Sequence, residues 1–143
     1  MNKQALVLVI NLNARKDRLE NMQNRLNGID FKRIEAVEAG NLDNNLVSKY
    51  SYLSRPEIAC ISSHIKALET FLDTNEKMCC ILEDDVLLGR NFKKLIMNIF
   101  ELPQNSFILK IETFNNKVLQ NPYSKKHNKF RVKKIFSIHY GTA

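Results

Sequence analysis

Three consecutive carboxylates, Glu83, Asp84 and Asp85, directly follow the apolar run at residues 78–82. Adjacent negative charges repel one another. At the end of a buried segment they would also lose water, which is unfavourable without a cation or a hydrogen-bond donor. We therefore expect a positive charge nearby. Such oxygen ligands suit Mg²⁺ or Mn²⁺, which commonly bind one or two protein carboxylates together with substrate phosphates. A solvated acidic turn is the alternative interpretation.

Alternating strands and helices are predicted to position these carboxylates. Residues 5–12 form a continuous apolar run, typical of a strand that is buried on both faces. Residues 31–39 predict a weaker second strand, and residues 78–82 predict the strand that ends at the carboxylates. The pattern indicates an α/β protein with a mostly parallel sheet flanked by helices. In such sheets, ligands lie beyond the carboxyl ends of the strands.

The clearest local signal is a helix that starts at Ser54. Ser54 and Glu57 have the spacing of a capping box, and Pro56 suits the first helical turn. An apolar face is predicted to pack on the sheet, formed by Ile58, Ile61, Ile65, Leu68 and Leu72.

Weaker patterns complete the predicted secondary structure. Leu19, Met22 and Leu26 have helical spacing, and Gly28 follows as a C-cap. A helix capped by Asn91 is expected to run to Phe100, where Pro103 would stop it. Residues 40–52 are polar and are interpreted as an irregular loop. Two further strands are expected, in residues 106–112 and 130–140.

Length and composition indicate an ordinary globular protein. The 143 residues suffice for one domain, and the chain is 44% hydrophobic and 26% charged. No apolar run approaches the about 20 residues of a membrane span, and the start lacks a secretory signal, so a cytoplasmic location is expected. The three cysteines, Cys60, Cys79 and Cys80, are predicted to be reduced core residues, with a redox or metal role as the alternative.

The net charge of +7 is unevenly distributed. Residues 125–134 carry six lysines and arginines and no acid. Such a segment suits a phosphate-rich partner such as nucleic acid, anionic lipid or a phosphorylated glycolipid. A solvated edge strand is equally compatible with it. No nucleic-acid partner is expected, since neither an RNP-like aromatic motif nor a recognised helix-turn-helix is found in the sequence.

Several motifs resemble glycosyltransferase family 25, which includes bacterial lipooligosaccharide galactosyltransferases. They occur in the family's order and are "VINLNARKDRLENM", "LSRPEIACISSHIKAL", "ILEDDV", "FILKIET" and the terminal "GTA". The resemblance covers essentially the whole chain. It predicts one family-25-like domain over residues 1–143, resembling the N-terminal part of such an enzyme and incomplete at its C-terminus.

The resemblance implies a GT-A-like fold and a hexosyltransferase. The expected reaction transfers a hexose, commonly galactose, from a UDP-sugar to a hydroxyl of a lipooligosaccharide or lipopolysaccharide glycan. In this family the acidic triplet stands in for the DxD motif. Carried over by position, Glu83 and Asp84 are the predicted catalytic residues on the ribose and sugar side, and Asp85 is the predicted ligand of Mn²⁺ or Mg²⁺.

The resemblance also nominates residues that bind the nucleotide-sugar. Asn11, Asp17 and Arg18 match the family's "INL…DR" pattern, and Arg18 could pair with Asp17 or with phosphate. A surface ion pair is the alternative for Arg18. Glu57 and His64 lie seven residues apart on the predicted helix, where they could line a cleft. A structural role is the alternative for His64.

Assignments toward the C-terminus are fewer. Lys110 and Glu112 match the family pattern, and Glu112 is a candidate acid on the acceptor side. His127 and His139 are expected to have no catalytic role. Family members continue well past the "GTxAY" region, and no general base can be assigned here. An inactive remnant that at most binds a nucleotide-sugar is therefore the alternative function.

The expected partners follow from the reaction that the resemblance implies. They are a UDP-sugar donor and a glycolipid or oligosaccharide acceptor. The basic segment would suit peripheral contact with the anionic cytoplasmic face of the inner membrane.

Overall fold

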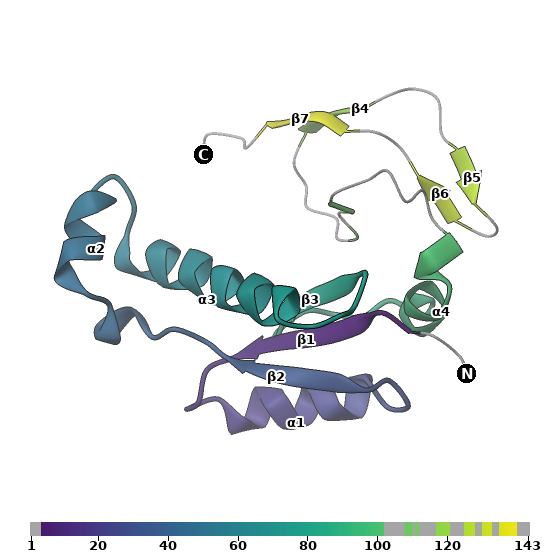
Figure 1. The fold of residues 1–143 in the computed structure, drawn as a ribbon, viewed down its shortest axis with the longest axis horizontal. Coiled ribbons are helices and arrows are strands. Elements are labelled where there is room, and N and C mark those ends of the chain that lie inside the picture. Colours follow the sequence, from purple (N-terminus) through teal and green to yellow (C-terminus); the bar gives the residue numbers. More distant parts are fainter. Residues whose placement is uncertain are drawn as a thin grey trace. The chain divides into compact units, whose positions relative to one another are not determined.

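A computed structural model describes residues 4–101, 108, 109 and 111, and the backbone of four strands between residues 117 and 139. The chain divides into two compact units, Met1–Ile99 and Phe100–Ala143 (Figure 1). The predicted functional residues up to Asp85 all belong to the first unit. Whether the chain forms one domain stays a prediction.

The first unit is built on a three-stranded parallel sheet. Its strands are β1 (Leu6–Asn11), β2 (Phe31–Glu35) and β3 (Cys79–Glu83), in the order β2-β1-β3. Ile10 of β1 stands opposite Ile34 of β2 and Glu83 of β3. The α/β class and the parallel sheet are therefore confirmed, and they are consistent with a GT-A-like fold.

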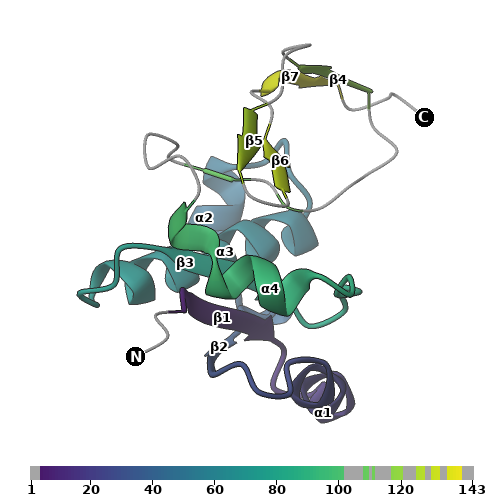
Figure 2. The same ribbon diagram turned by 90° about the vertical axis from the view of Figure 1, so that its right-hand side faces the viewer.

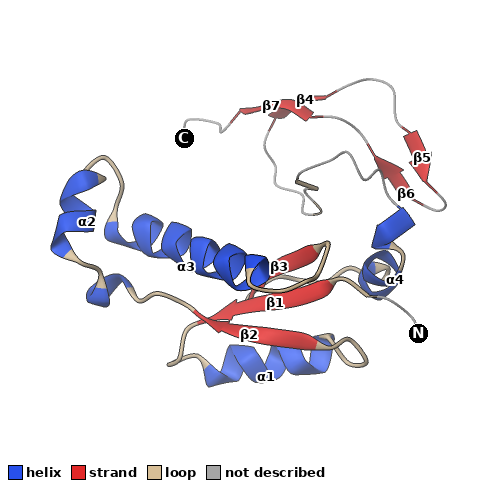
Figure 3. Ribbon diagram, in the orientation of Figure 1, coloured by secondary structure: helices blue, strands red, loops and turns tan. Residues whose placement is uncertain are grey.

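Helices α1 (Lys16–Arg25) and α3 (Arg55–Leu72) cover opposite faces of this sheet (Figure 3). Leu8 of the central strand packs with Ala67 on the α3 side. Val7 and Val9 point to the other face, because side chains alternate along a strand. All three β1 side chains are fully buried, as the continuous apolar run predicts.

Helix α3 begins as predicted but buries a different face. Ser54 and Glu57 form the capping box. The buried residues of α3 are Ile58, Ala59, Ser63 and Ala67. The predicted stripe is wrong beyond Ile58, since Ile61, Ile65, Leu68 and Leu72 are between 47% and 76% exposed. Small side chains let a helix lie close to a sheet, which favours the Ala59, Ser63 and Ala67 face.

The remaining helices differ in part from expectation. Helix α2 (Asn44–Lys49) lies where an irregular loop was expected, and the Asp43 side chain caps it by accepting a hydrogen bond from the Asn45 amide. A 3₁₀ turn, η1 (Ala39–Asn41), precedes it. Helix α4 (Phe92–Met97) is shorter than expected and is followed by a second 3₁₀ turn, η2 (Ile99–Glu101).

The two cap predictions are only partly met. The C-cap of α1 is Leu26 and not Gly28, but Gly28 has a φ of 74° in the turn that follows, a conformation that glycine adopts without strain. Asn91 stands at the start of α4, but its side chain makes no capping hydrogen bond.

Where the structure describes the second unit, its strands form two antiparallel pairs (Figure 2). Strand β4 (Lys117–Gln120) pairs with β7 (Ile135–His139), and β5 (Lys125–His127) pairs with β6 (Phe130–Val132). The single strand expected at residues 130–140 is thus two strands. The strand expected at residues 106–112, including Lys110 and Glu112, lies largely outside the described residues. Among the described helices, none is long and apolar enough to cross a membrane.

Candidate functional site

The parallel sheet brings the ends of β1 and β3 together. Ile10 is in register with Glu83, so the residues that follow each of them leave the sheet side by side. Asn11 is the last residue of β1, and Asp84 and Asp85 form the turn after β3. The topology therefore gathers amide and carboxylate groups at the carboxyl edge, where α/β sheets bind ligands.

Asp84 is a buried carboxylate with two donors. Its side chain is 8% exposed. Asn11 Nδ2 donates to Asp84 Oδ2 over 2.7 Å, and Arg18 Nη1 donates to Oδ1 over 3.1 Å. A buried charge is tolerated when it is paired and hydrogen-bonded, and both conditions are met here. The solvated-turn interpretation does not describe Asp84.

Asn11 extends this network to strand β2. Its Nδ2 also donates to the Arg15 carbonyl over 2.9 Å, and its Oδ1 accepts from Arg33 Nε of β2 over 2.9 Å. Asn11 itself is 1% exposed. All the polar atoms of this buried amide are thereby satisfied, which makes it a rigid support for Asp84.

Arg18 supplies the positive charge expected beside the carboxylates. Its Nη1 also lies 3.0 Å from Asp85 Oδ2, so one guanidinium bridges two adjacent acids. The Asp85 side chain is 56% exposed, in contrast to that of Asp84. Arg18 does not pair with Asp17. Asp17 instead pairs with Arg15, whose Nη2 lies 2.7 Å from Asp17 Oδ2.

The exposed Arg15–Asp17 pair gives a prediction about pH. The Arg15 hydrogen bond lowers the pKa of Asp17 from its usual 3.8 to about 2. Because the pKa of Asp17 is lower in the folded protein than in the unfolded chain, its interaction with Arg15 stabilises the fold above pH 3.8. This stabilisation is lost as the pH falls toward 2. Arg15→Gln should raise the pKa of Asp17 toward 3.8, as followed by the carboxyl carbon resonance in an NMR titration.

Arg15→Lys is the matched control for this titration. Lysine keeps the charge but lacks the planar fork that makes two hydrogen bonds to the carboxylate, so an intermediate pKa is expected. An unchanged pKa in Arg15→Gln would contradict the prediction and would assign the lowering to the Arg18 and Asp17 backbone amides.

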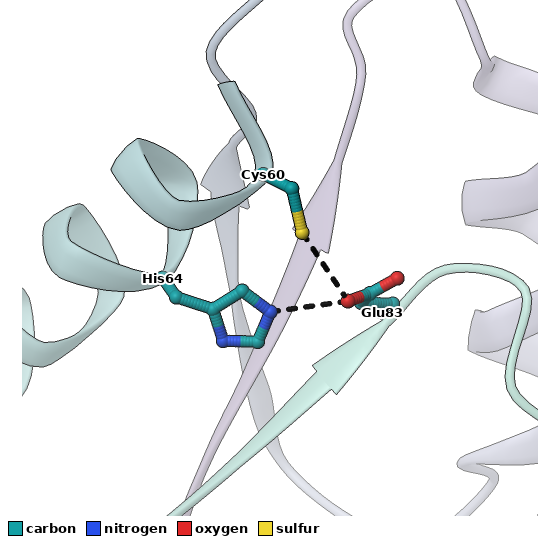
Figure 4. A group of neighbouring side chains, drawn as sticks. All are labelled: Cys60, His64 and Glu83. Atoms are coloured by element: carbon teal, nitrogen blue, oxygen red, sulfur yellow. Dashed lines mark hydrogen bonds and ion pairs between the residues drawn. The ribbon is translucent and has the colours of Figure 1, made fainter. Parts of the chain in front are cut away.

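His64, Cys60 and Glu83 form a second cluster at the same edge (Figure 4). His64 Nε2 lies 3.1 Å from Glu83 Oε1, and Cys60 Sγ lies 3.9 Å from the same oxygen. The expectation that all cysteines are core residues is wrong for Cys60, which is exposed, whereas Cys80 is buried and Cys79 is half-buried. All three are described and none forms a disulfide.

Glu57 has a different environment from His64. Its Oε2 accepts hydrogen bonds from Ser54 N and Ser54 Oγ, each over 2.7 Å, and these bonds lower the pKa of Glu57. The side chain thus caps α3 and does not line the cleft beside His64. A role for Glu57 in cofactor binding stays a prediction.

A cleft of about 240 Å³ joins the two clusters. The N-terminal half of α3 forms one wall, and residues at the strand ends form the other. Of the predicted site residues, the cleft lining includes Arg18, His64, Glu83, Asp84 and Asp85. Asn11, Asp17 and Glu57 are not in the lining. A second cleft, of about 260 Å³, has Arg25, Arg90 and Lys93 in its lining but no carboxylate.

Two residues of this edge were missed by the sequence interpretation. Arg33 contacts Asn11 across the sheet, and no local motif marks that contact. Cys60 lies four residues before His64 on a predicted helix, a spacing that places both side chains on one face. That spacing was available in the sequence and could have identified Cys60.

A comparison with protein-family models matches residues 4–143 to glycosyltransferase family 25, described as a lipopolysaccharide (LPS) biosynthesis protein family. The match covers nearly the whole chain. The chain therefore belongs to glycosyltransferase family 25, as the ordered motifs predict.

Curated relatives include animal and bacterial glycosyltransferases. Procollagen galactosyltransferase 2 of Mus musculus is 30% identical over 111 residues, which cover 66% of this chain and 18% of that protein. The lacto-N-neotetraose biosynthesis glycosyltransferase LgtB of Neisseria meningitidis serogroup A is 35% identical over 81 residues, covering 53% and 29%. LgtE of serogroup B is 29% identical over 129 residues, covering 81% and 46%. The matches thus span less than half of the length of these relatives.

Proposed function

We propose that this chain supplies the donor site of a metal-assisted hexosyltransferase. The donor would be a UDP-sugar, with galactose as the transferred hexose, and the acceptor a hydroxyl of a lipooligosaccharide or lipopolysaccharide glycan. The observation that supports this most directly is the Arg18–Asp84–Asp85 arrangement in a cleft of a family-25 chain. The relatives include a procollagen galactosyltransferase and a lacto-N-neotetraose biosynthesis glycosyltransferase, which supports this class of reaction.

The carboxylates divide into a buried one and exposed ones, which suggests different roles. Asp84 has both oxygens hydrogen-bonded and is 8% exposed, so we propose that it acts by holding Arg18. Glu83 is 49% exposed and lines the cleft, where it can accept hydrogen bonds from the sugar or ribose hydroxyls. Arg18 is 34% exposed and can turn its planar guanidinium toward a phosphate.

The chemistry of Asp85 fits Mn²⁺ or Mg²⁺. Its carboxylate is 56% exposed, and Arg18 is its neighbouring cation. These metals need only one or two protein carboxylates when substrate phosphates supply further oxygens. When bound, such a metal would neutralise the charge that develops on the departing diphosphate. Asp85 would hold it, while Arg18 and Asn11 keep the neighbouring Asp84 in place.

The group transfer breaks the bond between sugar C1 and the diphosphate oxygen and forms a bond from C1 to the acceptor oxygen. UDP leaves with the electron pair, and the acceptor proton passes to a base. None of the described residues is assigned as that base. The alternative function, an inactive remnant that at most binds a nucleotide-sugar, uses the same donor cleft.

The partners and location are proposed on the same basis. A cytoplasmic protein at the inner face of the membrane would meet both a UDP-sugar and a glycolipid acceptor. The basic residues 125–134 would favour contact with anionic lipid.

Calorimetric titration with UDP-galactose, with and without Mn²⁺, tests the donor site. We expect UDP-galactose to bind in the presence of Mn²⁺. Without Mn²⁺ its affinity should fall at least about tenfold, a loss of about 1.4 kcal/mol or more in binding free energy. Asp85→Asn should cause a similar loss in the presence of Mn²⁺, because the amide removes the anionic metal ligand. Asp73→Asn, an exposed aspartate at the end of α3, is the matched control and should bind like the unchanged protein.

Circular dichroism should first establish that each variant is folded. If the folded chain binds no UDP-sugar in either condition, the donor-site proposal is overturned. Binding that is independent of Mn²⁺ and Asp85 would overturn the metal assignment alone. UDP-glucose in a parallel titration tests the sugar, because tighter binding of UDP-glucose would contradict galactose as the transferred hexose.

A further inference from the structure

Cys60, His64 and Glu83 present three different ligand atoms at one point in the cleft. The sulfur, the imidazole nitrogen and a carboxylate oxygen all lie within 4.8 Å of one another. In Figure 4 the three side chains converge from helix α3 and the end of strand β3. A tetrahedral zinc site, with bonds of 2.0–2.3 Å, separates its ligand atoms by about 3.3–3.7 Å. Small side-chain rotations would therefore close the three atoms around one ion.

The backbone that carries these ligands is firmly placed. Cys60 and His64 are four residues apart on α3, so they stand one turn apart on the same face. The capping box at Ser54 fixes the start of this helix. Glu83 ends β3, which pairs with the central strand β1. Sites on rigid elements hold ligand atoms more precisely than sites on loops.

The Cys60 sulfur lies beside the Glu83 carboxylate, 3.9 Å from Oε1. A divalent cation between the sulfur and the carboxylate would bind both groups.

We propose that Cys60, His64 and Glu83 form a binding site for Zn²⁺ or a similar borderline transition metal. The proposal does not rest on the donor function, and the site differs in ligand type from the one proposed at Asp85. Thiolate and imidazole ligands favour zinc over magnesium or manganese, which prefer oxygen.

The geometry leaves room for a further ligand from the cleft. His64 and Glu83 side chains are 39% and 49% exposed, and both line the cleft with Cys60. Three protein ligands with an open fourth position are typical of exchangeable or catalytic zinc sites rather than closed structural ones. The fourth ligand would be water or an oxygen of a bound molecule.

Titration of the reduced, metal-free protein with Co²⁺ alone tests the site. Cobalt bound to a thiolate and an imidazole in tetrahedral geometry should give a sulfur-to-metal charge-transfer band and intense visible bands. Cys60→Ser should abolish the charge-transfer band, and His64→Gln should weaken binding about tenfold or more. Zn²⁺ should displace the cobalt and remove the bands.

Matched variants separate this site from the neighbouring groups. Cys79→Ser should keep the charge-transfer band, because Cys79 is not in the cluster. Asp85→Asn should also keep it, although the same variant should lose Mn²⁺-dependent UDP-galactose binding. A band that persists in Cys60→Ser, or no band in the unchanged protein at millimolar Co²⁺, would overturn the proposal. Failure of UDP-galactose binding would leave the cobalt result intact, so the two proposals fail separately.

Alkylation provides a measurement that does not depend on spectra. Zn²⁺ should slow the reaction of Cys60 with iodoacetamide about tenfold or more while leaving the rate at Cys79 unchanged, as measured by mass spectrometry of the peptides. Equal protection of both cysteines would indicate a general change in folding and would contradict a local site. Unchanged alkylation of Cys60 would likewise contradict zinc ligation.

Discussion

Replacing Asn11 by leucine is expected to lower the free energy of unfolding by about 3 kcal/mol. Asn11 is 1% exposed and donates to Asp84 Oδ2 over 2.7 Å. Leucine is of similar size, so the loss comes from hydrogen bonds rather than from a cavity. The variant would leave Asp84 with the Arg18 contact alone, and it would also remove the acceptor of Arg33 Nε. Buried groups that lose their partners account for the large effect.

Urea unfolding followed by circular dichroism measures this change. Asn13→Ala is the matched control, because Asn13 is exposed and accepts a single long contact of 3.4 Å from Arg33. Its expected effect is below about 0.5 kcal/mol. A loss below about 1 kcal/mol for Asn11→Leu would contradict the prediction, because it would mean that water satisfies Asp84 and Arg33 in the variant.

Replacing Arg18 by glutamine should destabilise the metal-free protein by about 2 kcal/mol. Its guanidinium bridges Asp84 and Asp85, so the variant leaves two adjacent carboxylates without their cation. Arg18 is 34% exposed, which reduces the effect below that of a fully buried pair. The same substitution should strengthen binding of Mn²⁺ alone, because the metal no longer competes with the guanidinium for Asp85.

Paired unfolding experiments with EDTA and with millimolar Mn²⁺ separate these two effects. Arg18→Gln should regain part of its lost stability with Mn²⁺, whereas the unchanged protein should respond less. Arg15→Gln is the matched control, because its partner Asp17 is 62% exposed and only a small change is expected. Unchanged stability in Arg18→Gln would contradict a structural role for the bridge. An unchanged response to Mn²⁺ would contradict the competition.

Much of the scaffold could be predicted from local sequence. The apolar run at β1 required burial on both faces, and Val7, Leu8 and Val9 are fully buried. Ser54 and Glu57 identified the start of α3, because a capping box depends on residues only three positions apart. The position of the carboxylates after a buried strand correctly indicated that a cation lies nearby.

Contacts between distant segments were less predictable. Arg18 is separated from Asp84 by 66 residues. The parallel pairing of β1 and β3 brings the helix that follows β1 close to the turn that follows β3. The buried face of α3 was misjudged because apolar spacing alone favoured Ile61 and Ile65. Close packing against the sheet selected the smaller side chains instead, with Ala67 fully buried.

The short helix α2 was also missed. Its segment, Asn44–Lys49, is rich in polar residues, and one Asp43 cap was too weak a signal to distinguish six helical residues from a loop. Leu42 and Ile58 form a small core cluster there, with Leu46 and Val47 packed against it. Packing on α3 therefore supports the helix, as is common for helices too short to be stable alone.

The sequence by itself determined the three strands of the parallel sheet, the capped helix, the family and the acidic edge, because each depends on neighbouring residues or on ordered motifs. The tertiary structure alone decided the partners of the charged groups. Arg18 joins Asp84 and Asp85, while Cys60 and His64 meet Glu83. Those pairings arise because the sheet register and the close approach of α3 fix distances that local sequence does not specify.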